Sequence, residues 1–344
     1  MRALKLCLTA ALAAALATSF GTISARAADK VIIAQPSHGF LYLPVYVARG
    51  KGFFKEENID LDVQVFAGGA PAMAAVISGN AHIYTGVPST PIKAYAKGQP
   101  VRIWAAMMGQ IGSNFVIQGD IAKRLKLTPQ TSPDDRIKAL KGLTIGINGP
   151  GSSLDQLIRY FLRNVGMNPD RDVTITPIGA AGSAMVAAFG QKRVDAFMFS
   201  SPTSDFAIKL HGAYMLFNLA KGEYPPLDGF LYVSFNSRAD WLEKNPDVAR
   251  RVARALWKGM KLMRENPKEA AEVVRKFFPK MDKETFDLAW EGTRHAFPAT
   301  PALKRSQVER ALKFLADTEG KAPQVDIEKV YTSKIVEAAA KDMK

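Results

Sequence analysis

Short apolar runs alternate with glycine-containing turns and helical patterns along the N-terminal part of the chain. Apolar runs at residues 31–34, 61–66 and 81–85 have the length of strands, and helical patterns lie between them at residues 43–49 and 71–77. Strands that alternate with helices are typical of a mostly parallel sheet flanked by helices. We therefore predict an α/β fold.

The same order of elements begins again near residue 143. The expected elements are strand 143–147, helix 152–165, strand 173–177, helix 183–189 and strand 194–199. Alanine-rich helices resemble one another through composition alone, but here the order of elements, the turn residues and the loop lengths agree as well. We therefore predict two similar halves, each built on a mostly parallel sheet.

Two extended segments are expected to cross between these halves, at residues 114–118 and 230–235. A pair of extended strands can absorb a rotation that packed helices cannot, so the crossings predict two lobes joined by a hinge. Amphipathic helices at 240–264, 267–277, 282–296 and 306–318 should pack on the first lobe. The expected divisions are a first lobe over 28–115, a second lobe over 116–232, a return to the first lobe over 233–320, and a C-terminal helical tail over 321–344.

Residues 1–27 have the pattern of a cleaved signal peptide. Arg2 and Lys5 precede an apolar segment, and Ala25-Arg26-Ala27 has the small-x-small form of a cleavage site. No later run reaches ~20 consecutive apolar residues, so none is expected to span a membrane. Cys7, the only cysteine, lies inside this leader with a long apolar run after it, unlike a lipid-anchor cysteine. We predict an unanchored periplasmic protein without disulfides.

The formal charge of +14 in 344 residues favours encounters with anions. Surplus lysine and arginine on a solvated face would also account for this charge. The basic residues are mixed with acids along helices, and no basic run is interleaved with stacking aromatic residues, so we expect no nucleic-acid partner. With 47% hydrophobic residues, the chain can bury a core large enough for two lobes.

A glycine-rich turn at residues 148–151 precedes the helix that opens at Ser152 and Ser153. Gly149 and Gly151 let the backbone approach a ligand, and the first N–H groups of a helix have no intrahelical partner. Together with the helix dipole, this arrangement favours an anion or a polar head group. The alternative is that Ser152 or Ser153 only caps the helix.

The motifs of common enzyme classes are missing from the sequence. His38, His82, His211 and His295 do not have metal-ligand spacing, and the expected mature chain lacks cysteine. There is no G-x-S-x-G motif, and GINGPG at 146–151 has its glycines in the wrong order for a dinucleotide fingerprint. We predict no catalytic residues, no metal site and no cofactor.

Five segments resemble the substrate-binding proteins of ABC importers in the sulfonate, taurine and nitrate group, the NMT1/THI5-like or SsuA-like family. They are YVARGKGFFKEENIDLDV (46–63), FAGGAPAMAAVISGNAHI (66–83), GLTIGINGPGSS (142–153), FGQKRVDAFMFSSP (189–202) and SRADWLEKNPDVARRVARAL (237–256). The resemblance covers about residues 31–317, and the Gly-Phe-Phe-x-x-Glu piece is its most specific part.

The resemblance implies a two-lobed periplasmic binding protein of the type II kind. Such a protein closes on a small anion or zwitterion, here a sulfonate, taurine, nitrate or an organic carboxylate, and presents the closed form to an inner-membrane ABC permease. We expect a monomer that is not an enzyme.

The family holds its solute between the lobes, in the loops at the strand ends, where ligands of open α/β sheets lie. At those positions the resemblance implies contacts from Ser37, His38, Phe40, Tyr42, Gly68, Gly69, Ser89, Thr90, Gly151, Ser152, Ser153, Ser200, Ser201 and Asp205.

These loops contain no arginine. A fully charged anion would therefore depend on helix N-termini and hydroxyl groups, so a partly anionic solute stays an alternative. His38 could donate to an acidic head group or be satisfied by water, Phe40 and Tyr42 could stack on the solute or seal the lobe, and Asp205 could meet an amine or cap a helix.

A second candidate is a receptor for a thiamine-precursor pyrimidine on the same fold. It would use Phe40 and Tyr42 for stacking, and Asp205 or Glu223 against ring nitrogens. Glu223 and Tyr224 lie in the loop before the second crossing, from which they could reach the cleft. A third candidate is an enzyme of the pyrimidine-synthase branch, but the leader and the lack of its cysteine- and histidine-rich features argue against it.

Overall fold

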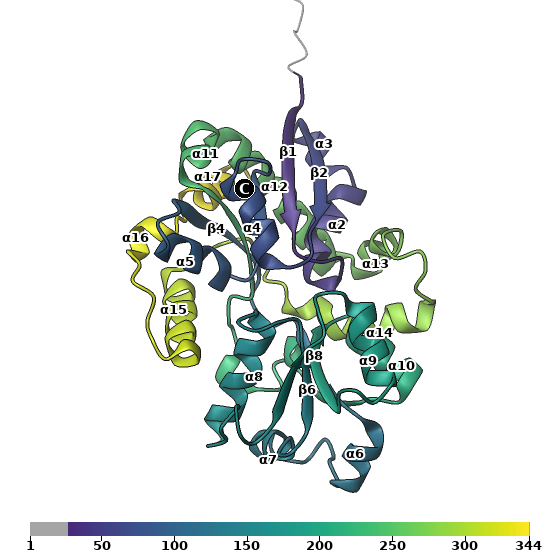
Figure 1. The fold of residues 1–344 in the computed structure, drawn as a ribbon. Coiled ribbons are helices and arrows are strands. Elements are labelled where there is room, and N and C mark those ends of the chain that lie inside the picture. Colours follow the sequence, from purple (N-terminus) through teal and green to yellow (C-terminus); the bar gives the residue numbers. More distant parts are fainter. Residues whose placement is uncertain (1–26, 344) are drawn as a thin grey trace, which may run out of the picture.

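Two five-stranded sheets dominate the computed structural model, which describes residues 27–343 (Figure 1). The first sheet has the order β2-β1-β3-β10-β4 and contains β1 (Asp29–Gln35), β2 (Ile59–Val65), β3 (Ile83–Gly86), β4 (Val101–Met108) and β10 (Val233–Arg238). The second has the order β7-β6-β8-β5-β9 and contains β5 (Ser113–Ile117), β6 (Thr144–Ile147), β7 (Thr174–Pro177), β8 (Ala196–Ser200) and β9 (Tyr214–Asn218). The expected signal peptide, apart from Ala27, lies outside the described residues.

The two sheets have the same topology. Pairs β1–β2, β1–β3, β6–β7 and β6–β8 are parallel. One strand in each sheet is reversed, because β10 runs antiparallel to β3 and β4 and β5 runs antiparallel to β8 and β9. The predicted α/β fold with two similar lobes is therefore confirmed, and each sheet is mixed rather than wholly parallel.

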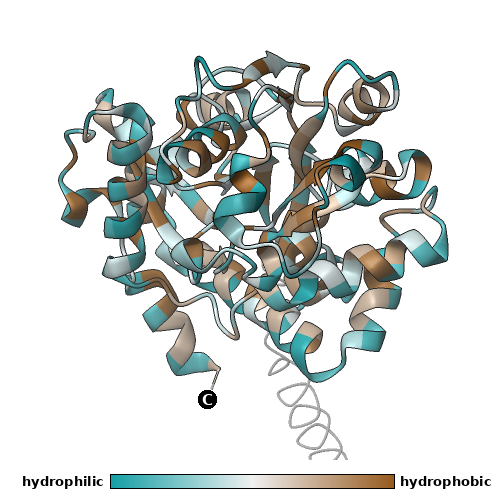
Figure 2. Ribbon diagram, turned by 90° about the horizontal axis from the view of Figure 1, so that it is seen from below, coloured by the Kyte–Doolittle hydropathy of each residue, from teal (hydrophilic) through white to brown (hydrophobic). Residues whose placement is uncertain are grey.

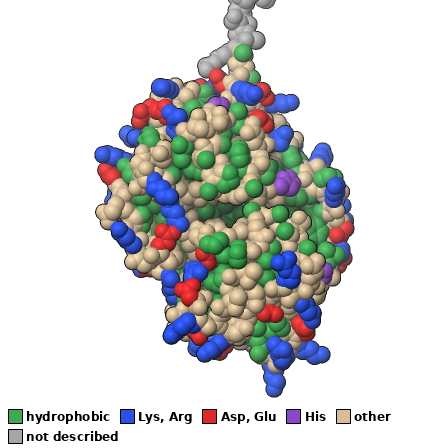
Figure 3. Space-filling view, viewed as in Figure 1, with side chains coloured by type: hydrophobic (Ala, Val, Ile, Leu, Met, Phe, Trp, Pro, Cys, Tyr) green, Lys and Arg blue, Asp and Glu red, His purple; other side chains and the backbone are tan. Residues whose placement is uncertain are grey.

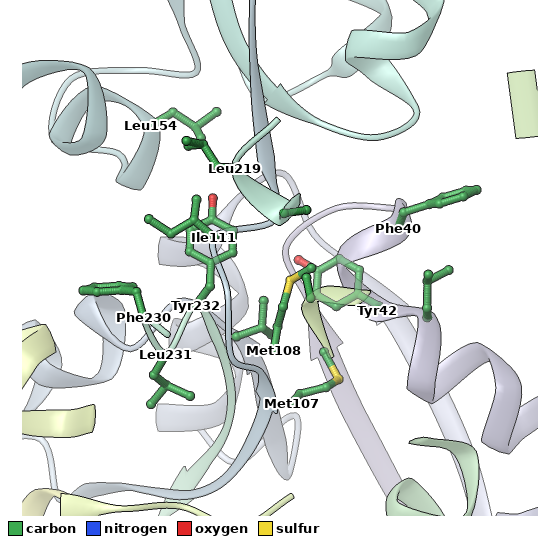
Figure 4. Close-up of a cluster of buried hydrophobic side chains, with 14 of the residues drawn as sticks. Phe40, Tyr42, Met107, Met108, Ile111, Leu154, Leu219, Phe230, Leu231 and Tyr232 are labelled. Atoms are coloured by element: carbon green, nitrogen blue, oxygen red, sulfur yellow. The ribbon is translucent and has the colours of Figure 1, made fainter. Parts of the chain in front are cut away.

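The chain changes sheets at residues 109–112, not within the segment 114–118 that the sequence predicted. Residues 113–117 pair with β8 on one side and β9 on the other, so this buried strand belongs entirely to the second lobe. The return crossing runs beside the first, because the Tyr232 N–H donates to the Met108 carbonyl at 2.9 Å. Figure 4 shows Met108, Ile111, Leu231 and Tyr232 together at this junction.

Helices cover both sheets. The first lobe carries the 3-10 turn η1 (Phe40–Tyr42), α2 (Leu43–Gly50), α3 (Phe53–Glu56), α4 (Gly69–Ile77), α5 (Ser89–Ala96), α11 (Ala239–Lys244), α12 (Pro246–Glu265), α13 (Pro267–Arg275), α16 (Ile327–Val330) and α17 (Lys334–Asp342). The second lobe carries α6 (Gly119–Arg124), α7 (Pro133–Lys138), α8 (Ser153–Asn164), α9 (Gly182–Gly190), α10 (Thr203–His211), and the 3-10 turns η2 (Leu219–Lys221) and η3 (Pro225–Leu227). Pro246 begins a new helix and thereby divides the predicted helix 240–264.

Two of the C-terminal helices bridge the lobes, although the sequence predicted that they pack on the first lobe. Helix α15 (Arg305–Glu319) packs on α8, where the rings of Tyr160 and Phe314 lie 5.1 Å apart. The region of α14 (Lys283–Thr293) and the 3-10 turn η4 (Arg294–Ala296) contacts α10 through the Lys209–Asp282 ion pair at 2.6 Å. Figure 1 shows α14 and α15 on opposite sides of the junction.

Apolar residues concentrate on the inner faces of the helices and on the strands, while hydrophilic residues follow the outer helix faces (Figure 2). Among the described residues, no helix combines the length and the apolar character needed to cross a membrane.

Candidate functional site

A cavity of about 610 Å³ lies between the two lobes. The space-filling view shows a hollow at this level of the molecule, with apolar side chains around it (Figure 3). The first lobe contributes the loop after β1 and the helices α4 and α5. The second lobe contributes the turn before α8, the end of β8 and Ser113 at the start of β5, and Tyr232 lines the cavity from the return crossing.

The structure brings most of the predicted contact residues together in this cavity. Those that line it are Ser37, Tyr42, Gly68, Gly69, Ser89, Thr90, Gly151, Ser152, Ser153 and Ser200. They come from five loops that are far apart in the sequence. Their ligand contacts stay a prediction. Four others, His38, Phe40, Ser201 and Asp205, are not part of the lining.

Phe40 and His38 face a different part of the first lobe. The Phe40 ring is fully buried and lies 4.8 Å from the ring of Phe278, and Figure 4 shows it pointing away from Tyr42. His38 donates from Nε2 to the Phe277 carbonyl at 3.0 Å, and its Nδ1 accepts from the Tyr46 hydroxyl at 3.2 Å. Both residues therefore hold the segment after α13, at Phe277 and Phe278, against the loop that follows β1.

Ser201 and Asp205 lie behind the cavity wall, in a buried polar cluster. The Asn114 amide donates to the hydroxyls of Ser201 and Ser204, at 3.3 and 2.8 Å. The Ser204 hydroxyl donates to Asp205 at 3.2 Å. Burial raises the pKa of the Asp205 carboxyl above its ordinary value, although hydrogen bonds from Ser201 and Ser204 oppose this shift.

Glu223 and Tyr224 also lie outside the cavity lining. The Glu223 carboxylate accepts from the Asn218 N–H at 2.7 Å and thereby closes its own loop. The Tyr224 ring packs 4.7 Å from Phe161 in the core, and its hydroxyl accepts from Asn164 at 3.1 Å.

The protein's own side chains already use the N-terminus of α8. Ser152 is the N-cap and accepts from the Asp155 N–H at 3.3 Å, while the Asp155 carboxylate accepts from the Gly151 N–H at 2.7 Å. Arg159 pairs with the same carboxylate at 2.8 Å. Ser152 therefore caps this helix, and fewer N–H groups remain here for an anion than the glycine-rich turn suggested, while its ligand contact stays a prediction.

Helices α4 and α5 begin at the cavity without such caps. Neither has a side chain bonded to its N-terminal N–H groups, and neither has an acidic residue in its first turn. Gly68 precedes α4 with a φ of 110°, a conformation that suits glycine. Pro71 and Pro91 supply no N–H in these first turns, and the Thr90 N–H already donates to the Val87 carbonyl at 3.2 Å, so it is chiefly the partial positive charge of the two helix ends that favours an anionic group here.

Several lining residues were not predicted from the sequence: Tyr84, Tyr232, Ser113, Asn148, Lys93 and Lys97. The Tyr84 hydroxyl donates to Thr90 at 3.2 Å, and Tyr232 and Ser113 share a hydrogen bond of 2.7 Å. Burial raises the pKa of Tyr232 to about 12, so its phenol stays protonated at neutral pH. Tyr84 in β3 and Tyr232 directly before β10 lie near strand ends, and this position could have indicated a site. The apolar residues beside them in the sequence instead favoured a place in the core.

The lining is mostly apolar and its charges are of one sign. Lys93 and Lys97 contribute to it, and neither aspartate nor glutamate does among the described residues. Glu319 forms an ion pair with Lys93 from outside the cavity lining. Within the described part of the chain, no group of three or more histidine, cysteine, aspartate or glutamate side chains could hold a metal ion.

The model of a family described as NMT1/THI5 like matches residues 40–270. The Bacillus subtilis protein YtlA, provisionally described as a binding protein, is 26% identical over 302 residues, which cover 86% of this chain and 85% of YtlA. The nitrate/nitrite binding protein NrtA of Nostoc is 26% identical, over 74% of this chain and 61% of NrtA.

Solved structures share the fold at lower identity. The periplasmic nitrate-binding protein NrtA from Synechocystis has a TM-score of 0.69 at 18% identity, with 92% of this chain and 89% of NrtA covered. The periplasmic aliphatic sulphonate binding protein SsuA from Escherichia coli has a TM-score of 0.67 at 16% identity, with 88% of this chain and 96% of SsuA covered. Both similarities show the fold alone.

Proposed function

The chain belongs to the NMT1/THI5-like family, and from this premise we propose that it is the solute-binding component of an ABC importer, which captures a small organic anion between its lobes. The positive character of the cavity lining carries the proposal. The N-termini of α4 and α5, neither of which has a side-chain cap, lie at the cavity together with Lys93 and Lys97, and no carboxylate lines it among the described residues. An anionic group is the ligand that this arrangement would stabilise.

The size and lining of the cavity favour an organic anion over an inorganic ion. About 610 Å³ is in the range of pockets for small organic molecules, and Leu41, Met73, Leu154 and Phe199 are among its lining residues. A sulfonate or carboxylate with an apolar body would satisfy both the donors and the apolar wall. Nitrate and bicarbonate would leave most of this wall uncovered.

Closure would follow from contacts with both lobes. A head group held by α4 and α5 of the first lobe could also accept from Ser200 and from the neutral phenol of Tyr232. Contacts made only when the lobes approach would favour the closed state by their free energy. In this proposal a monomer works in the periplasm without catalysis, and an inner-membrane permease distinguishes the closed from the open shape.

The pyrimidine alternative is not favoured. It needs acids against ring nitrogens, but Asp205 and Glu223 lie outside the lining. It also needs aromatic stacking from Phe40, whose ring is fully buried against Phe278.

A thermal-shift screen of the leaderless protein tests the proposal. The panel contains alkane- and arenesulfonates, taurine, aromatic and aliphatic carboxylates, nitrate, bicarbonate and pyrimidines. A bound organic anion at 100 times its Kd should stabilise the fold by about 2.7 kcal/mol and raise the Tm accordingly. A shift with pyrimidines alone, or turnover of any compound without a shift, would contradict the proposal.

Two lysine variants add a matched test. Lys93 and Lys209 each pair with an acid at the C-terminal helices, but only Lys93 lines the cavity. Lys93→Met should weaken binding of the best anion about tenfold, since it removes one cation beside the head group. Lys209→Met should leave the Kd unchanged in isothermal titration calorimetry. Equal effects of the two substitutions would contradict an anion site at Lys93.

A further inference from the structure

The loop after β1 meets the loop after β8 directly, main chain against main chain. The Phe40 N–H of the first lobe donates to the Ser201 carbonyl of the second lobe at 3.0 Å. Ser37 and Ser200 line the cavity from these same two loops. Phe40 and Ser201 are not part of the lining, so their bond joins the lobes behind the cavity wall.

Gly39 permits this approach because it has no side chain. A Cβ at Gly39 would lie 3.3 Å from the Ser201 carbonyl oxygen, and the next nearest atoms are the Ser200 hydroxyl at 3.8 Å and the Pro202 ring at 4.0 Å. All three atoms belong to the second lobe. The backbone of Gly39 is extended, with a φ of 176°, and other residues adopt this φ as well. The reason for glycine here is therefore the neighbouring lobe, and not the conformation of its own loop.

Both sides of this contact are fixed by what packs behind them. Phe40 is fully buried, and its ring lies 4.8 Å from the ring of Phe278 and 5.5 Å from that of Phe286. On the other side, the Asn114 amide donates to the Ser201 hydroxyl at 3.3 Å. Neither loop can yield without disturbing the buried residues behind it, so the contact limits how closely the lobes approach.

The contact also lies near the first crossing between the lobes. Leu41 follows Phe40 and packs beside Gly112, where a Cβ would lie 2.5 Å from the Leu41 side chain. In a hinge motion, a displacement near the axis grows with distance from that axis. A small wedge at Gly39 would therefore separate the lobes more widely at the edges of the sheets that are remote from the crossing.

We propose that Gly39 and Ser201 form a closing stop. The lobes close until the main chains of these two residues meet, and the hydrogen bond from Phe40 then holds them there. The proposal rests on the proposed function only in that the lobes move. Because the stop stabilises the closed state without touching the solute, it changes the affinity for every solute by a similar factor and leaves the preference among solutes unchanged.

Distances between spin labels on the two lobes test the stop. Cys7 is the only cysteine in the sequence, so the leaderless protein can carry one label on each lobe, at Val65→Cys and Ala181→Cys. Both residues are exposed, and each follows or ends an edge strand, β2 or β7, that lies across its sheet from the strands leading into the crossings.

Pulsed electron paramagnetic resonance should show a longer distance between the labels in Gly39→Ala than in the wild type, and a still longer one in Gly39→Val. The lengthening should occur with and without solute, because a larger side chain props the lobes apart in both states. Melting curves establish that the variants fold, and Gly39→Ala supplies the test if the valine variant does not. Wild-type distances in the folded Gly39 variants would overturn the stop.

Isothermal titration calorimetry provides the second measurement. Gly39→Val should weaken the binding of each anion that the wild type binds by about three- to tenfold, the factor that corresponds to one hydrogen bond. Ala187→Val is the matched control, since Ala187 is exposed on α9 and does not line the cavity, and it should keep the wild-type distance and Kd.

A loss of affinity in Gly39→Val that differs strongly from one anion to the next would mean that Gly39 acts on the solute, and would overturn the stop. Failure of every anion to bind the wild type would instead overturn the proposed function. The distances between the labels in the solute-free protein would still decide whether the stop exists.

Discussion

Asp205 is a carboxyl group that the fold removes from water. It lies in the cluster of Asn114, Ser201 and Ser204 behind the cavity, and burial raises its pKa. An acid whose pKa is raised by folding stabilises the folded state most below its unfolded pKa, and that contribution is lost as the pH rises through the folded pKa. Above its unfolded pKa, Asp205 therefore contributes less to the free energy of unfolding than it does in acid.

Asp205→Asn should raise the Tm at pH 7 by a few degrees, because an amide oxygen can accept the same hydrogen bond from Ser204 and the amide has no charged form for burial to disfavour. The gain should vanish below about pH 3.9, the ordinary value for an aspartate. Thermal melts between pH 3 and pH 8 measure this.

Asp282→Asn is the control, because folding shifts the pKa of Asp282 in the opposite direction from that of Asp205. Lys209 and the Thr285 N–H hold the pKa of Asp282 below its usual range, so this carboxylate stabilises the fold above its unfolded pKa and loses that effect as the pH falls through the folded pKa. Asp282→Asn should lower the Tm at pH 7. A pH-independent effect of Asp205→Asn would contradict the account of Asp205.

Helices α2 and α12 form the main helix pair of the first lobe and cross at Gly259. A Cβ at this position would lie 2.6 Å from the Pro44 carbonyl oxygen and 3.2 Å from the Ala48 Cβ. Backbone atoms cannot give way as the end of a side chain can. The close approach of the two helices therefore requires glycine here, even though alanine is the better helix former.

Overpacking of such a close contact costs ~1–3 kcal/mol, and alanine regains ~1 kcal/mol through its helix propensity, so Gly259→Ala should destabilise the protein by up to ~2 kcal/mol. Urea denaturation followed by circular dichroism measures the change. Gly292→Ala in α14 is the control, since its Cβ would meet only the Asn218 amide, at 3.2 Å. Equal stabilities of the two variants would show that α2 and α12 can separate at little cost.

Glu319 connects the two lobes at the rim of the cavity. Its carboxylate pairs with Lys93 of α5 and accepts from the Gln156 amide of α8 at 2.8 Å. Arg163 of α8 also donates to the Thr318 carbonyl at 2.6 Å. The end of α15 is therefore fixed to the second lobe and attached to the first through Lys93. In the absence of a solute, this bridge should restrain lobe opening.

Glu319→Ala should increase the radius of gyration of the ligand-free protein in small-angle X-ray scattering, and leave that of the liganded protein unchanged, because the solute then holds the lobes together. Glu265→Ala is the control, since Glu265 is exposed and pairs with Lys261 of its own helix at 3.9 Å. A ligand-free radius of gyration that does not respond to Glu319→Ala would mean that the bridge does not restrain opening.

Local pattern determined most of the secondary structure of this protein. The apolar period and the turns at Gly68 and Gly151 placed the repeated strand, turn and helix units, since such signals act between neighbours in sequence. Helices α3, α5, α6 and α7 and strands β4 and β9 were not predicted. The loops that line the cavity were found because ligands in α/β folds lie at strand ends.

Tertiary structure alone decided which residues share the cavity. Phe40 and Asp205 lie in predicted loops but turn away from it, whereas Tyr84 and Tyr232 lie in apolar runs but reach it. The direction of a side chain at a strand end depends on what packs behind it, and the sequence does not encode that partner locally. For the same reason the predictions of β5 as a crossing and of α15 as a helix of the first lobe were wrong, because an apolar face shows that a segment packs but not against which surface.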